Sequence, residues 1–263
     1  MLDGMSSPQH AATPRLVAFD LDDTLAASKS PLGPRMAGDL VELLGIVDVC
    51  VISGGQYAQF ETQLIQKLPV DDPSVFARLH LMPTCGTQYY LFRDGSWQLQ
   101  YAENLTEEER TAALVAVEQE AKRLDLWEEN TAGPILEDRG SQITFSALGQ
   151  HAALDAKKAW DPTGEKKNML RAAVQALLPN LEVRSGGSTS IDITRHGIDK
   201  AYGMNKLAEL TGIPLDEMLF VGDRLDPDGN DYPVKALGVT SHPVTGPDDT
   251  AAFVEDFLAL HSA

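Results

Sequence analysis

Residues 16–25 are Leu-Val-Ala-Phe-Asp-Leu-Asp-Asp-Thr-Leu, and this stretch indicates both the fold and the chemistry of the chain. Its four leading apolar residues predict a buried strand, and Asp20 and Asp22 follow where that strand ends. Because an unpaired carboxylate is costly to bury, the pair predicts a bound cation or a polar reaction there. The spacing suits phosphoryl transfer: Asp20 would attack phosphorus, and Asp22 would exchange a proton with the leaving and incoming oxygens. The simpler alternative is an acidic, solvated turn.

Three later segments also place polar residues at the end of an apolar run or at the start of a helical pattern. These residues are Ser53, Gly54 and Gly55 after one strand, Lys200 at a helix, and Asp223, Asn230 and Asp231 after another strand. A hydroxyl with bare backbone N–H groups can bind phosphate oxygens, and a lysine can neutralise phosphate charge. Each segment alone has a structural explanation, but their joint occurrence in this order favours a phosphate site.

Together these segments resemble the four motifs of the haloacid dehalogenase (HAD) superfamily of phosphotransferases, in order and over nearly the whole chain. The resemblance implies catalytic roles for Asp20, Asp22, Ser53 and Lys200. It also implies an Mg²⁺ cofactor bound by Asp20, the backbone carbonyl of Asp22 and Asp223, with help from Asn230 and Asp231. Hard oxygen ligands of this kind are the ones Mg²⁺ prefers.

The second half of the chain resembles the eukaryotic-type phosphomannomutases, which belong to subfamily IIB of that superfamily. The similar segments are 222–231, with its longer acidic loop, 185–193 and 139–141. The resemblance implies that Ser190 and Asp192 grip sugar hydroxyls and that Arg139 faces the substrate. Ser190 and Asp192 would project on one side of a strand, because side chains alternate with a period of two.

Two departures from the mutases concern phosphate binding. Gln150 stands where the mutases have an arginine, and a second arginine of the mutases falls near Lys157 or Lys158. A mutase must bind a bisphosphate, and a guanidinium grips phosphate with two parallel hydrogen bonds that glutamine and lysine do not provide. We therefore expect a Mg²⁺-dependent phosphatase acting on sugar phosphates through an aspartyl phosphate. The alternatives are a phosphomannomutase or phosphoglucomutase, and a phosphosugar-binding protein without catalysis.

The order of the expected elements predicts an α/β fold. Strands at 16–19, 47–52 and 79–82 alternate with helical patterns, which implies a Rossmann-like HAD core with a parallel sheet. From residue 87, hairpin patterns and long helices predict an inserted α+β cap of the C2 type. We expect a flexible N-terminal tail over 1–14, the core over 15–86 and 187–263, and the cap over 87–186.

Composition excludes several partners. The 263 residues carry a formal net charge of −18, which argues against nucleic acid and anionic membranes. No apolar run approaches a membrane span, and two cysteines make no disulfide framework. The first eight residues lack the apolar core of a signal peptide. We expect a cytoplasmic monomer or homodimer whose partner is a small phosphorylated substrate.

Overall fold

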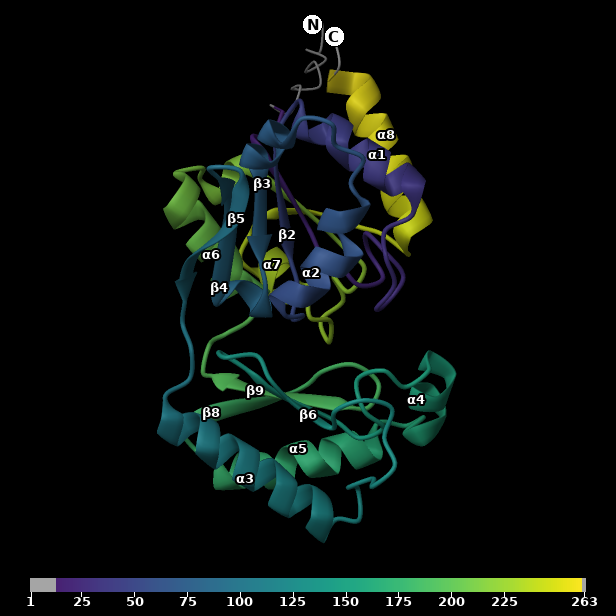
Figure 1. The fold of residues 1–263 in the computed structure, drawn as a ribbon, viewed down its shortest axis with the longest axis vertical. Helices are drawn as coiled ribbons and strands as arrows, with labels where there is room; N and C mark the ends of the chain where they lie inside the picture. Colours follow the sequence, from purple (N-terminus) through teal and green to yellow (C-terminus); the bar gives the residue numbers. More distant parts are fainter. Residues whose placement is uncertain (1–12, 262–263) are drawn as a thin grey trace, which may run out of the picture.

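The structure, a computed structural model, describes residues 13–261, which form a larger core and a smaller cap (Figure 1). Residues 1–12 of the expected N-terminal tail lie outside the described residues. The core is built around one seven-stranded sheet in the order β11-β10-β1-β2-β3-β4-β5. Its strands are β1 (Leu16–Phe19), β2 (Asp48–Ile52), β3 (Leu79–Met82), β4 (Gln88–Arg93), β5 (Ser96–Ala102), β10 (Met218–Gly222) and β11 (Thr240–Pro243). Strands β11, β10, β1, β2 and β3 are parallel, as the alternation of strands and helices predicted.

Helices cover both faces of the core sheet, because the strands are apolar on both sides. They are α1 (Pro34–Leu44), α2 (Tyr57–Gln63), α6 (Lys200–Thr211), α7 (Tyr232–Ala236) and α8 (Pro247–His261). Val17 and Phe19 of β1 pack with α1, α2 and α8, whereas Leu16 and Ala18 pack with α6 and α7 on the other face. This double layer confirms the expected Rossmann-like α/β core.

The cap is a four-stranded antiparallel sheet with two long helices against it. Its elements are α3 (Glu107–Arg123), β6 (Leu136–Asp138), β7 (Ile143–Ser146), α4 (Leu154–Trp160), α5 (Glu165–Leu177), β8 (Leu181–Ser185) and β9 (Ser190–Arg195). The strand order is β6-β7-β9-β8. Helices α3 and α5 bury one face of this sheet (Figure 1). A capping box between Thr106 and Glu109 begins α3, and α4 was not expected from the sequence.

The expected boundaries of the cap differ from the sheets in the structure. The hairpin β4–β5, assigned to the cap by its sequence pattern, pairs antiparallel with β3 and extends the core sheet. Its Tyr89 and Leu91 are buried in the core, so apolar burial holds it there. Strand β9, expected in the core, pairs with β7 and β8 in the cap. We therefore propose that the cap runs from the end of β5 at Ala102 to the start of α6 at Lys200. None of the helices within residues 13–261 has the length and apolar character needed to cross a membrane.

Candidate active site

The carboxyl ends of three neighbouring parallel strands bring the predicted catalytic residues together. Strand β1 lies between β10 and β2, with Phe19 opposite both Val221 and Val51. Asp20, Ser53 and Asp223 therefore leave the sheet at the same edge. This is the edge at which open α/β sheets bind ligands.

Three carboxylates converge at this edge. Asp20, Asp223 and Asp231 each offer an oxygen that lies within 4.8 Å of the other two, and we call this set the acidic cluster. Asp20 and Asp231 are buried and Asp223 is half-buried. Such a set of hard oxygen donors fits Mg²⁺. Asn230, also predicted as a ligand, is exposed on the same loop.

Lys200 supplies the positive charge beside this cluster. Its Nζ lies 2.6 Å from Asp20 Oδ1 and 2.5 Å from Asp231 Oδ1, and the side chain is 1% exposed. Lys200 is the first residue of α6, directly after Asp199, whose carboxylate caps the helix by accepting a hydrogen bond from the Tyr202 N–H at 3.0 Å. The helix start thus places a charged ammonium in the interior of the core.

The charges at this edge shift one another's pKa values. Burial raises the pKa of Asp20 to about 7, against the opposing effect of Lys200 and with a further rise from Asp231. Burial alone would lower the pKa of Lys200, but Asp20 and Asp231 hold it well above its usual range. Burial and the charge of Asp231 also raise the pKa of Asp223. These directions describe an excess of negative charge that a cation would offset.

Thr24 and Gly222, which were not predicted as site residues, shape the acidic cluster. The Thr24 hydroxyl donates to Asp223 Oδ1 at 3.2 Å and accepts from the Asp223 N–H at 3.1 Å. A Cβ at Gly222 would lie 2.4 Å from Asp231 Oδ2, so only glycine leaves room for that carboxylate. Both residues lie inside quoted motifs, and that position is the signal that could have identified them.

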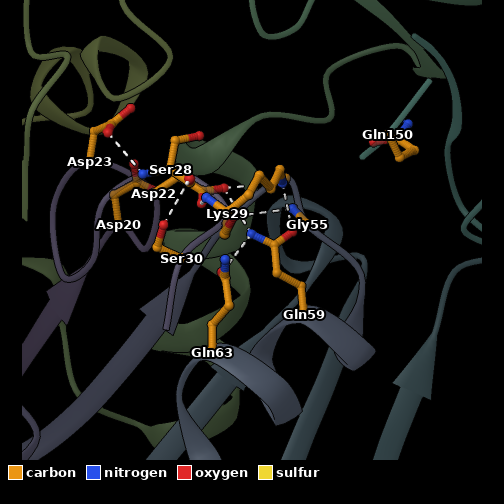
Figure 2. Close-up of polar contacts among 12 residues, drawn as sticks. Asp20, Asp22, Asp23, Ser28, Lys29, Ser30, Gly55, Gln59, Gln63 and Gln150 are labelled. Atoms are coloured by element: carbon orange, nitrogen blue, oxygen red, sulfur yellow. Dashed lines mark hydrogen bonds and ion pairs between the residues drawn. The ribbon is translucent and has the colours of Figure 1, made fainter. Parts of the chain in front are cut away.

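Asp22, the predicted proton donor, lies outside the acidic cluster and has partners of its own (Figure 2). Its carboxylate accepts hydrogen bonds from the backbone and side chain of Lys29 and from the side chain of Gln59. Burial would raise the pKa of Asp22, but the charge of Lys29 and these hydrogen bonds together hold it below its ordinary value. Lys29 and Gln59 were missed from the sequence, since neither lies in a recognised motif.

The loop of Ser53, Gly54 and Gly55 is held by hydrogen bonds to the segment after β3. The Gly55 N–H donates to Ser53 Oγ at 3.1 Å, while Ser53 and Gly55 carbonyls accept from the N–H groups of Cys85 and Thr84. Thr84 and Cys85 have φ values of 49° and 56°, a conformation that non-glycine residues rarely adopt. Backbone strain of this kind is often found at functional sites.

Arg139 reaches from the cap to this loop. Its Nη1 donates to the Gly54 carbonyl at 2.7 Å, and its Nε and Nη2 donate to Glu137 Oε2. Gln56 Nε2 donates to the other oxygen of Glu137 at 2.7 Å. The Arg139 side chain is 8% exposed, so it joins the cap to the core and presents little of its guanidinium to a ligand.

Asp192 and Ser190 lie on β9 of the cap sheet. Asp192 Oδ1 accepts from Gln142 Nε2 at 2.9 Å and from Thr144 Oγ1 at 2.7 Å. The half-buried thiol of Cys85 has its pKa raised to about 12 by burial, and its charged surroundings include Lys200, Asp192 and Asp20. Both donors to Asp192 are neutral side chains of the cap.

Gln150 and Lys157 contact one another in the cap. Lys157 Nζ donates to the Gln150 carbonyl at 2.9 Å, and burial and the charge of Lys29 lower the pKa of Lys157. Gln150 Nε2 is buried without a hydrogen-bond partner among residues 13–261. Figure 2 shows Gln150 apart from the group around Asp22.

Comparisons with known proteins agree on a family. The sequence profile described as eukaryotic phosphomannomutase matches residues 37–260, a range that begins after Asp22. A phosphomannomutase of Dendrobium officinale is 26% identical over 247 residues, which are 90% of this chain and 91% of that protein. A phosphomannomutase of Schizosaccharomyces pombe is 25% identical over 255 residues, again 90% and 91% of the two chains.

Solved structures show the same fold. A haloacid dehalogenase-like hydrolase from Bacteroides thetaiotaomicron aligns with a TM-score of 0.65 at 16% identity, over 93% of this chain and 99% of that one. An N-terminally truncated IMP-nucleotidase from Plasmodium falciparum aligns with a TM-score of 0.67 at 14% identity, over 94% and 71%. At these identities the likeness concerns the fold alone.

Proposed function

This chain belongs to the eukaryotic phosphomannomutase family within the HAD superfamily, and we propose that it hydrolyses sugar phosphates through a phosphoenzyme formed at Asp20. The observation that carries the proposal is the buried contact of Asp20 with Lys200 next to the two other carboxylates of the acidic cluster. A purely structural role would not require so much buried negative charge in one place.

The proposed reaction has two steps. In the first, Asp20 forms a bond to phosphorus while the bond to the sugar oxygen breaks, and Asp22 gives that oxygen a proton. In the second, water attacks phosphorus, Asp22 takes a proton from the water, and the bond to Asp20 breaks to release phosphate. Lys200 holds Asp20 in place and offsets charge on the phosphoryl group.

The acidic cluster would hold Mg²⁺, which supplies positive charge between the carboxylate nucleophile and the anionic phosphate. The loop of Ser53, Gly54 and Gly55 would contribute a hydroxyl and N–H groups to phosphate oxygens. Ser190 and Asp192 would bind sugar hydroxyls from the cap.

Hydrolysis is favoured over isomerisation by the cap residues. Arg139 is engaged by Glu137 and the Gly54 carbonyl. By the resemblance, Gln150 and either Lys157 or Lys158 stand where the mutases have arginines. A bisphosphate intermediate would therefore meet few free guanidinium groups in the cap.

The second candidate function is that of a hexose phosphate mutase. It is favoured because the matching family profile describes phosphomannomutases and the similar proteins are named phosphomannomutase. The two candidates separate on the product formed from mannose 1-phosphate with a hexose bisphosphate activator. Free phosphate supports the phosphatase, and predominant 6-phosphate supports the mutase. If the absence of a guanidinium at position 150 limits binding of the bisphosphate, Gln150→Arg should raise the affinity for it.

The test of the phosphoenzyme is hydrolysis of p-nitrophenyl phosphate with Mg²⁺. Asp20→Asn should abolish it, because an amide is a poor nucleophile, and EDTA should suppress it. Activity that survives both changes would refute the mechanism. Tight calorimetric binding of sugar phosphates without turnover over a broad panel would instead indicate a phosphosugar-binding protein.

A further inference from the structure

The side chain of Gln59 on α2 contacts three other polar side chains, and all of its hydrogen-bonding groups are used. Its Nε2 donates to Asp22 Oδ2 at 2.8 Å and to Gln63 Oε1 at 2.9 Å, and its Oε1 accepts from Lys29 Nζ at 2.7 Å. We call Asp22, Lys29, Gln59 and Gln63 the Asp22 network (Figure 2). An amide has two donor hydrogens and one acceptor oxygen, so both donors of the Gln59 amide are used and its oxygen has a partner.

The orientation of this amide is determined by its surroundings. If the amide were flipped, its oxygen would face Asp22 Oδ2 and the side-chain oxygen Oε1 of Gln63, which are both acceptors. Gln63 is 5% exposed and one turn further along the same helix, so it provides a rigid support. Gln59 therefore presents an N–H to Asp22 in a constrained direction.

Gly55 is part of the same arrangement. A Cβ at Gly55 would lie 2.2 Å from Gln59 Oε1, so the amide packs against the loop that we assign to phosphate binding. The Gln59 amide therefore has room only because residue 55 is a glycine. This packing places the Asp22 network directly beside the proposed phosphate site.

The two oxygens of Asp22 are not equally occupied. Oδ2 accepts from Gln59 Nε2 and, at 3.2 Å, from Lys29 Nζ, whereas Oδ1 accepts from the Lys29 N–H at 2.7 Å. Each carboxylate oxygen has about two acceptor positions. Oδ2 is saturated by these two donors, and Oδ1 keeps a free position.

We propose that Gln59 and Lys29 are positioning residues that orient the Asp22 carboxylate so that Oδ1 exchanges the proton with the sugar oxygen. Gln63 acts indirectly, because it orients Gln59 and makes no hydrogen bond to Asp22 itself. The proposal rests on the proposed function, since it presupposes that Asp22 serves as the proton donor. It assigns a role in phosphoryl transfer to residues outside the four motifs.

The leaving group provides the test. A sugar alkoxide needs a proton as the bond to phosphorus breaks, whereas p-nitrophenolate is stable enough to leave without one. Gln59→Met keeps the length of the side chain and removes its hydrogen bonds. We measure kcat/KM, because it reports the transfer of the phosphoryl group to Asp20 and not the later attack of water, which both substrates share. We expect Gln59→Met to lower kcat/KM at least about tenfold for a hexose phosphate and less than about twofold for p-nitrophenyl phosphate.

Lys29→Met gives a second variant on an exposed loop, where loss of folding is not expected, and it should act in the same direction. Gln100→Met is the matched control, because Gln100 is exposed on β5 and lies outside the Asp22 network. Gln100→Met should leave kcat/KM unchanged for both substrates.

The possible outcomes distinguish the positioning role of Gln59 and Lys29 from the phosphatase activity. If Gln59→Met and Lys29→Met lower kcat/KM equally for both substrates, or for neither, the positioning role is refuted while the phosphatase stands. If the wild-type protein hydrolyses neither substrate, the proposed function itself fails. A loss specific to the hexose phosphate in both variants supports the inference.

Discussion

Charged side chains at the strand ends of the core and charged side chains of the cap have different kinds of partner. In the core, the three carboxylates of the acidic cluster lie around one ammonium, that of Lys200. In the cap, Arg139 is paired with Glu137, and Asp192 accepts hydrogen bonds from neutral neighbours. The core therefore holds an excess of buried negative charge that a cation would offset. In the cap, by contrast, the Arg139 charge is paired with Glu137, and the Asp192 carboxylate is held by neutral donors. We infer that the core supplies the chemistry and the cap supplies hydrogen bonds to the substrate.

The largest effect is expected from removing the ammonium in the core. Lys200→Met leaves Asp20 and Asp231 without their shared partner, and breaking a buried ion pair typically costs about 3–5 kcal/mol. We expect the free energy of unfolding in urea to fall by about this amount. The rate of p-nitrophenyl phosphate hydrolysis should fall at least about a hundredfold.

Lys206→Met is the control for this variant. Lys206 lies on the same helix and contacts Glu103 and Glu209 at 3.5 and 3.6 Å, in a partly exposed position. Its loss should change the unfolding free energy by less than about 1 kcal/mol. Equal effects of the two substitutions would contradict the special role of the buried ammonium.

Mg²⁺ should stabilise the protein through the acidic cluster. A ligand that binds only the folded state adds about 2.7 kcal/mol when present at a hundred times its Kd. We expect Tm to rise when MgCl₂ replaces EDTA, with NaCl at equal ionic strength as the control. Asp223→Asn removes one carboxylate and should shrink this rise. An unchanged rise would mean that Mg²⁺ binds elsewhere.

A smaller effect, confined to substrate binding, is expected from Asp192 in the cap. Asp192→Ala should raise KM for hexose phosphates about tenfold and leave KM for p-nitrophenyl phosphate nearly unchanged, since only the sugar offers hydroxyls. Glu129→Ala, an exposed carboxylate of the cap, is the control. Equal changes for both substrates would indicate that Asp192 holds β9 in place through Gln142 and Thr144.

The smallest effect concerns a paired charge of the cap. Hydrogen bonds from Arg195 and from the Thr106 N–H hold the pKa of Glu109 below its ordinary value of 4.5. Because the folded state lowers this pKa, the stability it contributes is present above the unfolded value and is lost as pH falls through the folded value.

Urea titrations of wild type and Glu109→Gln from about pH 6 to about pH 3 check this expectation. The stability difference between them should shrink as the pH falls. A difference that stays constant would show that the hydrogen bonds act independently of the charge on Glu109.

Local patterns predicted the core well. The apolar run before Asp20 and the helix that begins at Lys200 depend on neighbours a few residues away, and both appear in the structure. The strand ends could be placed at one edge because parallel strands share a direction. Four segments far apart in the chain could thus be assigned to one site.

Pairing partners could not be predicted in the same way. The hairpin of residues 88–102 has the same local pattern in either sheet, and only its contact with β3 assigns it to the core. Arg139 was expected to face the substrate, but Glu137, two residues earlier, and Gly54, from the core, engage its guanidinium. Neither partner carries a signal in the sequence.

The sequence by itself determined the alternation of strands and helices in the core, the family and the residues at the strand ends, because these depend on periodicity and short motifs. Only the tertiary structure decided which charges are compensated. Lys29 and Gln59 come to Asp22 from a loop and a helix separated along the chain, and their hydrogen bonds exist only once α2 packs beside β1. Electrostatic partners are chosen by distance in space, and the packing of the whole core sets that distance.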